Sequence, residues 1–380
     1  MKMRWFRIFG IVLAVVLIGG LALSCAAPAP PAPPGTAPEL EKELTASKAQ
    51  IAKLEKEIAA LKAPPKKVKQ IVLKMALYHG SASLYNRIYS EYLPLVEENT
   101  QGRVKIEIYP GGALVKGPAM LEGIQTGVCD IAYPWGGYMS KTVPLLGLEA
   151  LPIWKDFQGA HYALDDPSLV DLYNQAYAEK GLNNVRVFIM KASGPRMIST
   201  TKKQIKVPSD LKGLKIKAMA GPEADFCALV GASATVITPA EIYEALERGI
   251  LDGTVSSVTN LADPAWNWRE VCEYVSAYGF GVAGLHMLFN KKAFDAIPAD
   301  LTPIVENTIR VAHMAVRYRT IEDYEHMWST MVPEMMTVYT PTPEERKVWD
   351  ETVSPLIDTF LGKTGALGQK ALDIAYKYNK

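Results

Sequence analysis

Cysteine is scarce in this chain of 380 residues, which contains only four. Cys25 follows an apolar N-terminal run and is treated separately below. The other three, Cys129, Cys227 and Cys272, are an odd number and include no CxxC spacing. Disulfide frameworks and cysteine-based zinc sites both need sets of cysteines at short, regular spacings, so the sequence indicates neither.

A surplus of one charge is also missing, since 41 basic side chains stand against 40 acidic ones. A protein whose main partner is nucleic acid needs a strongly basic face, so this balance argues against that class of function. The hydrophobic fraction of 49% is ordinary for a soluble globular protein, and the length allows two domains.

Common sequence motifs of catalysis are lacking as well. The chain contains no GxSxG, no HExxH and no P-loop, and it pairs no nucleophile with a base at a recognisable spacing. The acidic pair Asp165-Asp166 lies at a predicted helix boundary, where carboxylates cap free amide groups. The sequence therefore predicts a protein that is not an enzyme and has no cofactor.

The N-terminus is typical of a targeting segment. Residues 1–25 begin with basic side chains and continue, over 8–23, as an uncharged apolar run that is short for a membrane-spanning helix. The run ends in Ala22-Leu23-Ser24-Cys25, typical of a bacterial lipobox, whose cysteine is lipidated and becomes the first residue. The alternative is an uncleaved anchor helix with an incidental cysteine. Residues 26–38, rich in Pro and Ala, predict a stiff tether of polyproline II type.

A heptad pattern over residues 39–62 predicts a helix that can form a coiled coil. Its apolar a and d positions are Leu44, Ile51 and Ile58, and Leu40, Leu54 and Leu61, respectively. Ile at a with Leu at d favours a parallel dimer, so a homodimer through this segment is one interpretation. Three heptads are marginal alone, and a solvated single helix that acts as a spacer is the other. Residues 63–69 form a linker rich in Pro and Lys.

From residue 70 onward, strands and helices alternate in a way that is typical of two α/β lobes. The first lobe is predicted over residues 70–192, with strands at 71–77, 104–109 and 129–133 and helices at 81–98, 118–126 and 159–180. The second lobe is predicted over 193–284, entered by a strand at 185–190, with strands at 214–218 and 234–237 and helices at 223–229 and 240–248.

Later segments are expected to join the two lobes. Residues 271–278 and 285–290 predict strands that cross back to the first lobe, and 299–331 predicts a long helix that packs on both lobes. Terminal helices are predicted over 343–378. Parts of 285–380 are assigned to the first lobe, and parts of the C-terminal helices to the second.

Several side chains near predicted strand ends are candidates for ligand contact, because ligands of open α/β sheets bind at the carboxyl ends of strands. Lys217 lies near the end of the strand at 214–218, although it could also lie on a solvated face. Arg196 follows a predicted turn at a strand end, where the alternative is a surface arginine. Trp135 and Tyr138 lie on a Gly-rich loop and suit stacking on a ligand, unless they only cap the lobe.

Four segments carry a resemblance to a known family. They are GRVKIEIYPGGAL at 102–114, VPSDLKGLKIK at 207–217, EIYEALERGILDG at 241–253 and FNKKAFDAIP at 289–298. In order and spacing they resemble the extracytoplasmic solute-binding receptors of TRAP (tripartite ATP-independent periplasmic) transporters, of DctP type, over about residues 70–380. The resemblance implies two lobes that are joined by crossing strands and a long helix and that close over a small ligand. It also implies delivery of that ligand to a membrane permease driven by an ion gradient.

The resemblance also implies roles for individual residues. The family clamps an organic carboxylate with an arginine from the strand before a helix, and Lys217 stands at that position in this chain. Lysine keeps the charge but loses the bidentate fork of arginine. Arg196 matches a second arginine of the family, which could take over the pairing. Tyr78 and His79 end the first strand, where the family places a ligand contact, and Ser256 matches an asparagine that binds ligand.

One departure from the family concerns metals. After Asp-Gly this chain reads TVSS at 254–257, where the family often has Gln-Glu-Asn-Pro. Some relatives hold a cation through an acidic residue in that region, and Val255 removes the carboxylate. We therefore expect no metal site.

The sequence as a whole predicts a membrane-anchored extracytoplasmic lipoprotein that binds a small, anionic and partly apolar or aromatic solute for a TRAP-type permease. A ligand-sensing lipoprotein that signals to a membrane partner through the heptad helix is one alternative. A substrate-binding protein of ABC type is another, and an extracytoplasmic hydrolase on a similar fold is a third.

Overall fold

The structure is a computed structural model that describes residues 37–62, 69–154, 156–261, 263, 266–279 and 281–378. Predictions for the targeting segment, Cys25 and most of the tether lie outside these residues. The chain divides into two compact units, residues 1–69 and 70–380. Among the described helices, none is both long enough and apolar enough to cross a membrane.

The helix expected over residues 39–62 is present as α2 (Ala37–Lys62). Of its heptad positions with described side chains, Ile51 is exposed and Leu54 is half-buried. An exposed apolar heptad position is compatible with both interpretations of the heptads, so pairing with a second copy stays a prediction.

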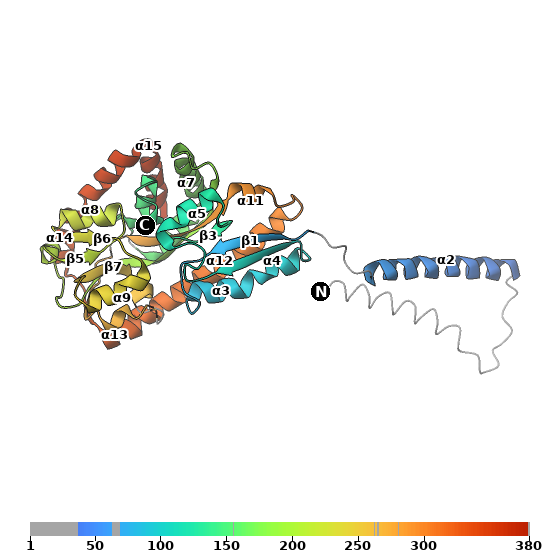
Figure 1. Cartoon of the computed structure of the whole chain (residues 1–380), viewed down its shortest axis with the longest axis horizontal. Helices are drawn as coiled ribbons and strands as arrows, with labels where there is room; N and C mark the ends of the chain where they lie inside the picture. Colours follow the sequence, from blue (N-terminus) through green and yellow to red (C-terminus); the bar gives the residue numbers. More distant parts are fainter. Residues whose placement is uncertain are drawn as a thin grey trace. The chain divides into compact units, whose positions relative to one another are not determined.

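The larger unit, residues 70–380, is built from ten described strands and a set of helices (Figure 1). The strands are β1 (Ile71–Ala76), β2 (Val104–Tyr109), β3 (Ile131–Ala132), β4 (Val185–Thr200), β5 (Lys215–Lys217), β6 (Ser233–Thr235), β7 (Gly253–Ser257), β8 (Tyr274–Ser276), β9 (Val282–Asn290) and β10 (Thr337–Tyr339).

The α-helices of this unit are α3 (Leu84–Tyr92), α4 (Pro94–Asn99), α5 (Met120–Thr126), α6 (Phe157–Leu164), α7 (Pro167–Glu179), α8 (Pro222–Leu229), α9 (Pro239–Glu247), α10 (Val258–Leu261), α11 (Lys291–Asp295), α12 (Thr302–His326), α13 (Val332–Met335), α14 (Pro343–Val353) and α15 (Pro355–Tyr378). Short 3-10 helices are η1 (Gly117–Ala119), η2 (Gly136–Tyr138), η3 (Pro144–Ala150), η4 (Pro208–Leu211) and η5 (Trp268–Glu270), and η6 (Met327–Met331) is a π-helix.

The strands form one continuous sheet in the order β2-β1-β3-β9-β4-β7-β5-β6. β1 pairs in parallel with β2 and β3, which makes the core of lobe 1, and β5 pairs in parallel with β6 and β7, which makes the core of lobe 2. Figure 1 shows the two groups of strands at different ends of the globular unit. This mixed α/β architecture with two lobes is the fold class that the alternating pattern predicted.

The connection between the lobes differs from the prediction. The crossing strands are β4, which runs from lobe 1 toward lobe 2, and β9, which returns antiparallel to it and includes the crossing strand expected at 285–290. The expected crossing strand at 271–278 is only β8, which stays in lobe 2 between β10 and β4. The predicted turn before Arg196 is also wrong, because β4 continues through it. A shift in the pairing register with β9 between Ala192 and Pro195 accommodates these residues within the strand. Gly194 there takes a φ of 129°, which favours glycine.

A long helix was correctly expected against both lobes. α12 packs on α3 and α4 of lobe 1 and on α10 of lobe 2, and it continues through η6 into α13 (Figure 1). The helix expected over residues 81–98 is instead two helices, α3 and α4. Pro94 causes the division, because its ring cannot continue a helix that is already under way but suits the first position of a new one.

Candidate functional site

A cavity lies between the two lobes, where the crossing strands pass from one to the other. Its empty space, part of which is open to solvent, amounts to about 310 Å³, and we call it the interlobe cleft. Its wall includes Trp135 and Gly137 from lobe 1, Glu149 of η3, Arg196 of β4, Glu223 of α8 and Gly284 of β9. Of the seven predicted ligand-binding residues, Trp135 and Arg196 lie in this wall.

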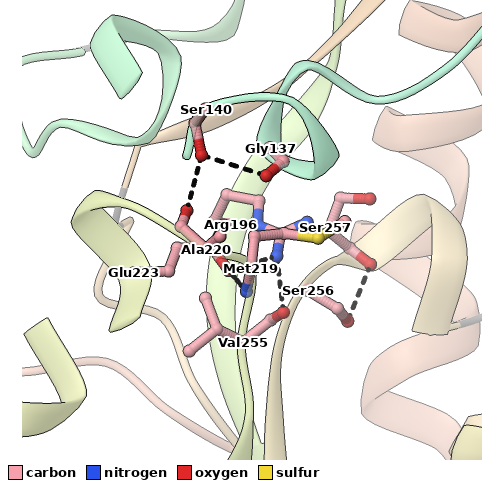
Figure 2. Close-up of polar contacts among 9 residues, drawn as sticks. All are labelled: Gly137, Ser140, Arg196, Met219, Ala220, Glu223, Val255, Ser256 and Ser257. Carbon is pink, nitrogen blue, oxygen red and sulfur yellow. Dashed lines mark hydrogen bonds and ion pairs between the residues drawn. The ribbon is translucent and has the colours of Figure 1, made fainter. Parts of the chain in front are cut away.

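Arg196 is buried and held in a defined position by lobe 2. Its side chain is 1% exposed, and β4 pairs it with Ser257 of β7. Nη2 of Arg196 donates to Glu223 Oε2 at 2.8 Å and to the Val255 carbonyl at 2.7 Å, as Figure 2 shows. The same carboxylate oxygen accepts from the Met219 amide at 2.7 Å. Arg196 is therefore a buried cation whose counter-ion is supplied by the protein.

Glu223 was not predicted from the sequence, although it is central to this arrangement. It lies in the first turn of α8, directly after Pro222, where acidic residues are common because they favour the positive end of the helix dipole. That position alone gave no reason to expect burial. Only the approach of β4 to α8 places Arg196 against the carboxylate.

Three aromatic side chains of lobe 1 form what we call the aromatic wall: Tyr78, Trp135 and Tyr138. The Trp135 and Tyr138 rings are stacked, with centroids 5.8 Å apart, and Tyr78 meets Trp135 edge to face at 5.0 Å. Burial raises the pKa values of Tyr78 and Tyr138 above the usual value for tyrosine. Both phenols are therefore protonated at neutral pH and can donate a hydrogen bond.

Lys217 joins the aromatic wall from lobe 2. Its Nζ lies 5.5 Å from the centroid of the Trp135 ring, and the side chain is completely buried at the end of β5. Burial, followed by the neighbouring charge of Arg196, lowers the pKa of Lys217 to about 7, while Glu223 acts in the opposite direction. The lysine is thus close to its titration midpoint at neutral pH.

Five buried polar atoms in this region have no hydrogen-bond partner among the described residues. They are Tyr78 Oη, Trp135 Nε1, Tyr138 Oη, Arg196 Nε and Lys217 Nζ. Buried polar groups are nearly always paired in proteins, and leaving one unpaired costs about 1–3 kcal/mol or more when it is charged. All five atoms can donate a hydrogen bond, so the group as a whole matches an acceptor-rich, anionic ligand.

The other two predicted residues are placed differently. His79 turns toward α3, and its ring packs on Tyr78 and Tyr85, with centroids 3.9 and 4.1 Å apart. Burial, aided by the charge of Lys191, lowers the pKa of His79 well below its usual value, so the imidazole is neutral. Ser256 is buried in β7, and its hydroxyl donates to the Ser257 carbonyl at 3.4 Å. Ligand contact by these two stays a prediction.

A second buried carboxylate in the wall was also not foreseen. Glu149 binds His286 Nε2 through Oε1 and accepts a longer bond of 3.4 Å from the Tyr173 hydroxyl. Gly136 and Gly284 make room for it, because a Cβ atom at either position would overlap with the Glu149 carboxylate. His286 is fully buried on β9 beside this carboxylate.

Metal and dinucleotide binding find little support in the geometry. Within the residues that the structure describes, no three His, Cys, Asp or Glu side chains are placed to hold a metal ion. The glycines at 279, 281 and 284 have the GxGxxG spacing. That spacing binds dinucleotides when it joins a strand to a helix, whereas here it leads into β9.

Comparison with known proteins identifies relatives of the chain. The sequence pattern of the family described as bacterial extracellular solute-binding protein, family 7 (DctP), matches residues 78–363. The C4-dicarboxylate-binding periplasmic protein DctP of Rhodobacter capsulatus is 27% identical over 316 residues, which cover 80% of this chain and 90% of that protein. The 2,3-diketo-L-gulonate-binding periplasmic protein YiaO of Escherichia coli K12 is 25% identical over 264 residues, or 68% and 77% of the two chains.

A solved structure shares the fold. It is that of a TRAP periplasmic solute-binding protein from Ralstonia eutropha H16 with bound (S)-2-acetolactate, and it aligns with a TM-score of 0.72. The alignment covers 81% of this chain and 99% of that one at 24% identity.

Proposed function

Because the chain belongs to family 7 of the bacterial extracellular solute-binding proteins, we propose that residues 70–380 are the solute receptor of a TRAP-type transporter and capture a small carboxylate. One observation carries the proposal. Two buried cations lie next to Trp135 of the aromatic wall: Arg196 shares the cleft wall with it, and Lys217 Nζ lies 5.5 Å from its ring, and each contributes an unpaired donor. A carboxylate supplies the acceptors and the negative charge that this group lacks.

Capture works by closure of the two lobes. Lobe 2 contributes the cations and lobe 1 contributes the aromatic wall, so a solute that contacts both stabilises the closed arrangement over an open one. Closure removes water from the cleft, which strengthens the attraction between the cations and the carboxylate. The receptor then delivers its solute to the membrane permease, which recognises the closed form.

Direct binding measurements test this function. We expect isothermal calorimetry of the purified protein to detect at least one small organic acid from a broad panel, and we expect that acid to raise the melting temperature. Mass spectrometry of small molecules released by denaturation identifies which acid co-purifies. If no carboxylic acid binds and only uncharged solutes do, the assignment of the cleft as a carboxylate site is wrong.

We further propose that the receptor is held at the outer face of a membrane by a lipid on Cys25. Replacing Cys25 with serine is expected to release the protein from the membrane fraction, because lipidation needs the thiol. Ultracentrifugal separation of membrane and soluble fractions after expression in a lipid-modifying bacterium measures the change. Ser24→Ala is the matched control, since a small residue before the cysteine is retained and the protein should stay bound. Full retention of the Cys25→Ser variant would contradict the lipid anchor.

A further inference from the structure

A carboxylate stands in the interlobe cleft directly against one of the two cations that are proposed to bind an anion. Glu223 is 2% exposed, and its Oε2 atom lies 2.8 Å from Arg196 Nη2 and 2.7 Å from the Met219 amide nitrogen (Figure 2). An ion pair of this geometry is close to neutral as seen by its surroundings. The charge of Arg196 is therefore compensated before any solute enters.

The remaining charges are Glu149 in the wall and Lys217 beside it, next to the Trp135 ring, and together they leave at most one positive charge uncompensated. Glu149 is bound to His286, so that pair is neutral if the imidazole is protonated and carries one negative charge if it is not. Lys217 has no described counter-ion in contact, and it supplies at most one positive charge. Summed over Arg196, Glu223, Lys217, Glu149 and its histidine, the cleft offers no more than one uncompensated positive charge.

Lys191, the other buried lysine of β4, does not add to this sum. Its Nζ donates to the Ala192 carbonyl at 3.1 Å and to the Thr320 hydroxyl of α12 at 3.0 Å, and it lies 4.9 Å from the centroid of the Tyr85 ring. Burial lowers the pKa of Lys191 well below its usual value. Both acceptors of Lys191 lie on β4 and α12, whereas Lys217 Nζ has no hydrogen-bond partner among the described residues.

We propose that Glu223 is a specificity-determining residue that restricts the cleft to solutes with a single negative charge. The proposal deepens the carboxylate-binding function and rests on it. The first carboxylate of a solute matches the one uncompensated cation. A second carboxylate would be buried with no cation left to pair with it, and burial of an unpaired charge is strongly unfavourable.

The rest of the wall supports the same solute class. Tyr78, Trp135 and Tyr138 present aromatic surface together with neutral donors, which suit an uncharged body that is apolar or carries hydroxyl groups. The preferred solute is thus a monocarboxylate, in contrast to the name of the relative from Rhodobacter capsulatus, a C4-dicarboxylate-binding protein.

The test compares acids that share a skeleton and differ by one charge. Succinate, adipate and terephthalate are each titrated by calorimetry against the purified full-length protein beside their monomethyl esters, together with a broad panel of further mono- and dicarboxylic acids. We expect the wild-type protein to bind the best monoanion at least tenfold more tightly than the matched dianion. In Glu223→Gln, which keeps the side-chain shape but removes the charge, we expect this ratio to fall at least tenfold.

Asp225→Asn provides a control with the same change in net charge on the same helix. Asp225 pairs with Lys363 at 2.7 Å near the surface, outside the wall of the cleft. The Asp225→Asn variant should therefore show the same ratio of monoanion to dianion affinity as the wild type. Dianions that bind the wild type as tightly as monoanions would overturn the charge limit and leave carboxylate binding intact. Binding of no acid of either kind would overturn both the charge limit and the carboxylate-binding function. The wild-type ratio alone decides whether the charge limit holds, so the test does not depend on folding of the variant.

Discussion

Replacing Arg196 with alanine is expected to destabilise the protein by about 3–5 kcal/mol, in addition to weakening the binding of solute at least tenfold. The loss follows from what remains: Glu223, 2% exposed, would be buried without its cation and with only the Met219 amide as a donor. Urea unfolding of the full chain at neutral pH, followed by circular dichroism, measures the change in the free energy of unfolding.

A double variant identifies the cause. Adding Glu223→Gln to Arg196→Ala removes the stranded charge, so it should recover a large part of the lost stability. Arg248→Ala is the control, because Arg248 pairs with Glu244 at 3.6 Å while both side chains are 68% exposed, and such a pair is worth about 0–1 kcal/mol. Equal losses at Arg196 and Arg248 would show that the buried pair has no special role.

Replacing Lys217 with methionine is expected to have opposite effects on binding and on stability. Binding of carboxylates should fall by at least a hundredfold, because the variant lacks the one uncompensated cation of the cleft. The unliganded protein should become more stable, since methionine has a similar length and no charge to desolvate. From the fall of the Lys217 pKa from 10.5 to about 7, the gain at pH 6 is on the order of 5 kcal/mol.

The pH dependence of this gain follows from the sign of the pKa shift. Between about pH 7 and pH 10.5 the unfolded chain binds more protons at Lys217 than the folded chain, so the unliganded wild type gains stability as pH rises. The advantage of Lys217→Met should therefore shrink by about 3 kcal/mol between pH 6 and pH 9. A constant difference across this range, measured by urea unfolding, would mean that Lys217 does not titrate there.

Solute affinity should depend on pH in the opposite direction from the stability of the unliganded protein. An anion next to Lys217 raises its pKa, so binding above pH 7 takes up a proton and the affinity falls as pH rises. Calorimetry in two buffers of different ionisation enthalpy at pH 8 detects this proton. Lys217→Arg is the informative control, because arginine stays charged at every pH used and its binding should lose the pH dependence.

The parts of the fold that depend on local patterns could be predicted from the sequence. β1 is a short, mainly apolar run, β2 alternates apolar and polar residues, and the glycines and prolines around α8 and α9 mark their ends. β4 could not be followed in this way. Its Gly194-Pro195 pair is typical of a turn, and only pairing with β9 and β7 on either side carries the strand through it.

The same limit applies to the site. Arg196, Lys217 and the aromatic wall could be proposed because they stand at strand ends or match a family pattern. Glu149 and Glu223 could not, since each lies in an ordinary helical context and becomes a buried charge only through a partner more than 25 residues away in the sequence, His286 and Arg196, respectively. Burial of a charge is decided by tertiary approach, and one sequence contains no local signal for it.

The division of the proposed binding groups between the two lobes has a consequence for the order in which a solute would be recognised. Arg196, Lys217 and Glu223 are all anchored to β4, β5 and α8, so their mutual geometry is complete within lobe 2 alone. Tyr78, Trp135 and Tyr138 all belong to lobe 1. If these residues bind the solute as proposed, we expect selection by charge to occur within lobe 2 before closure and selection by shape to follow closure. Ions of the wrong charge would then be rejected without any movement of the protein.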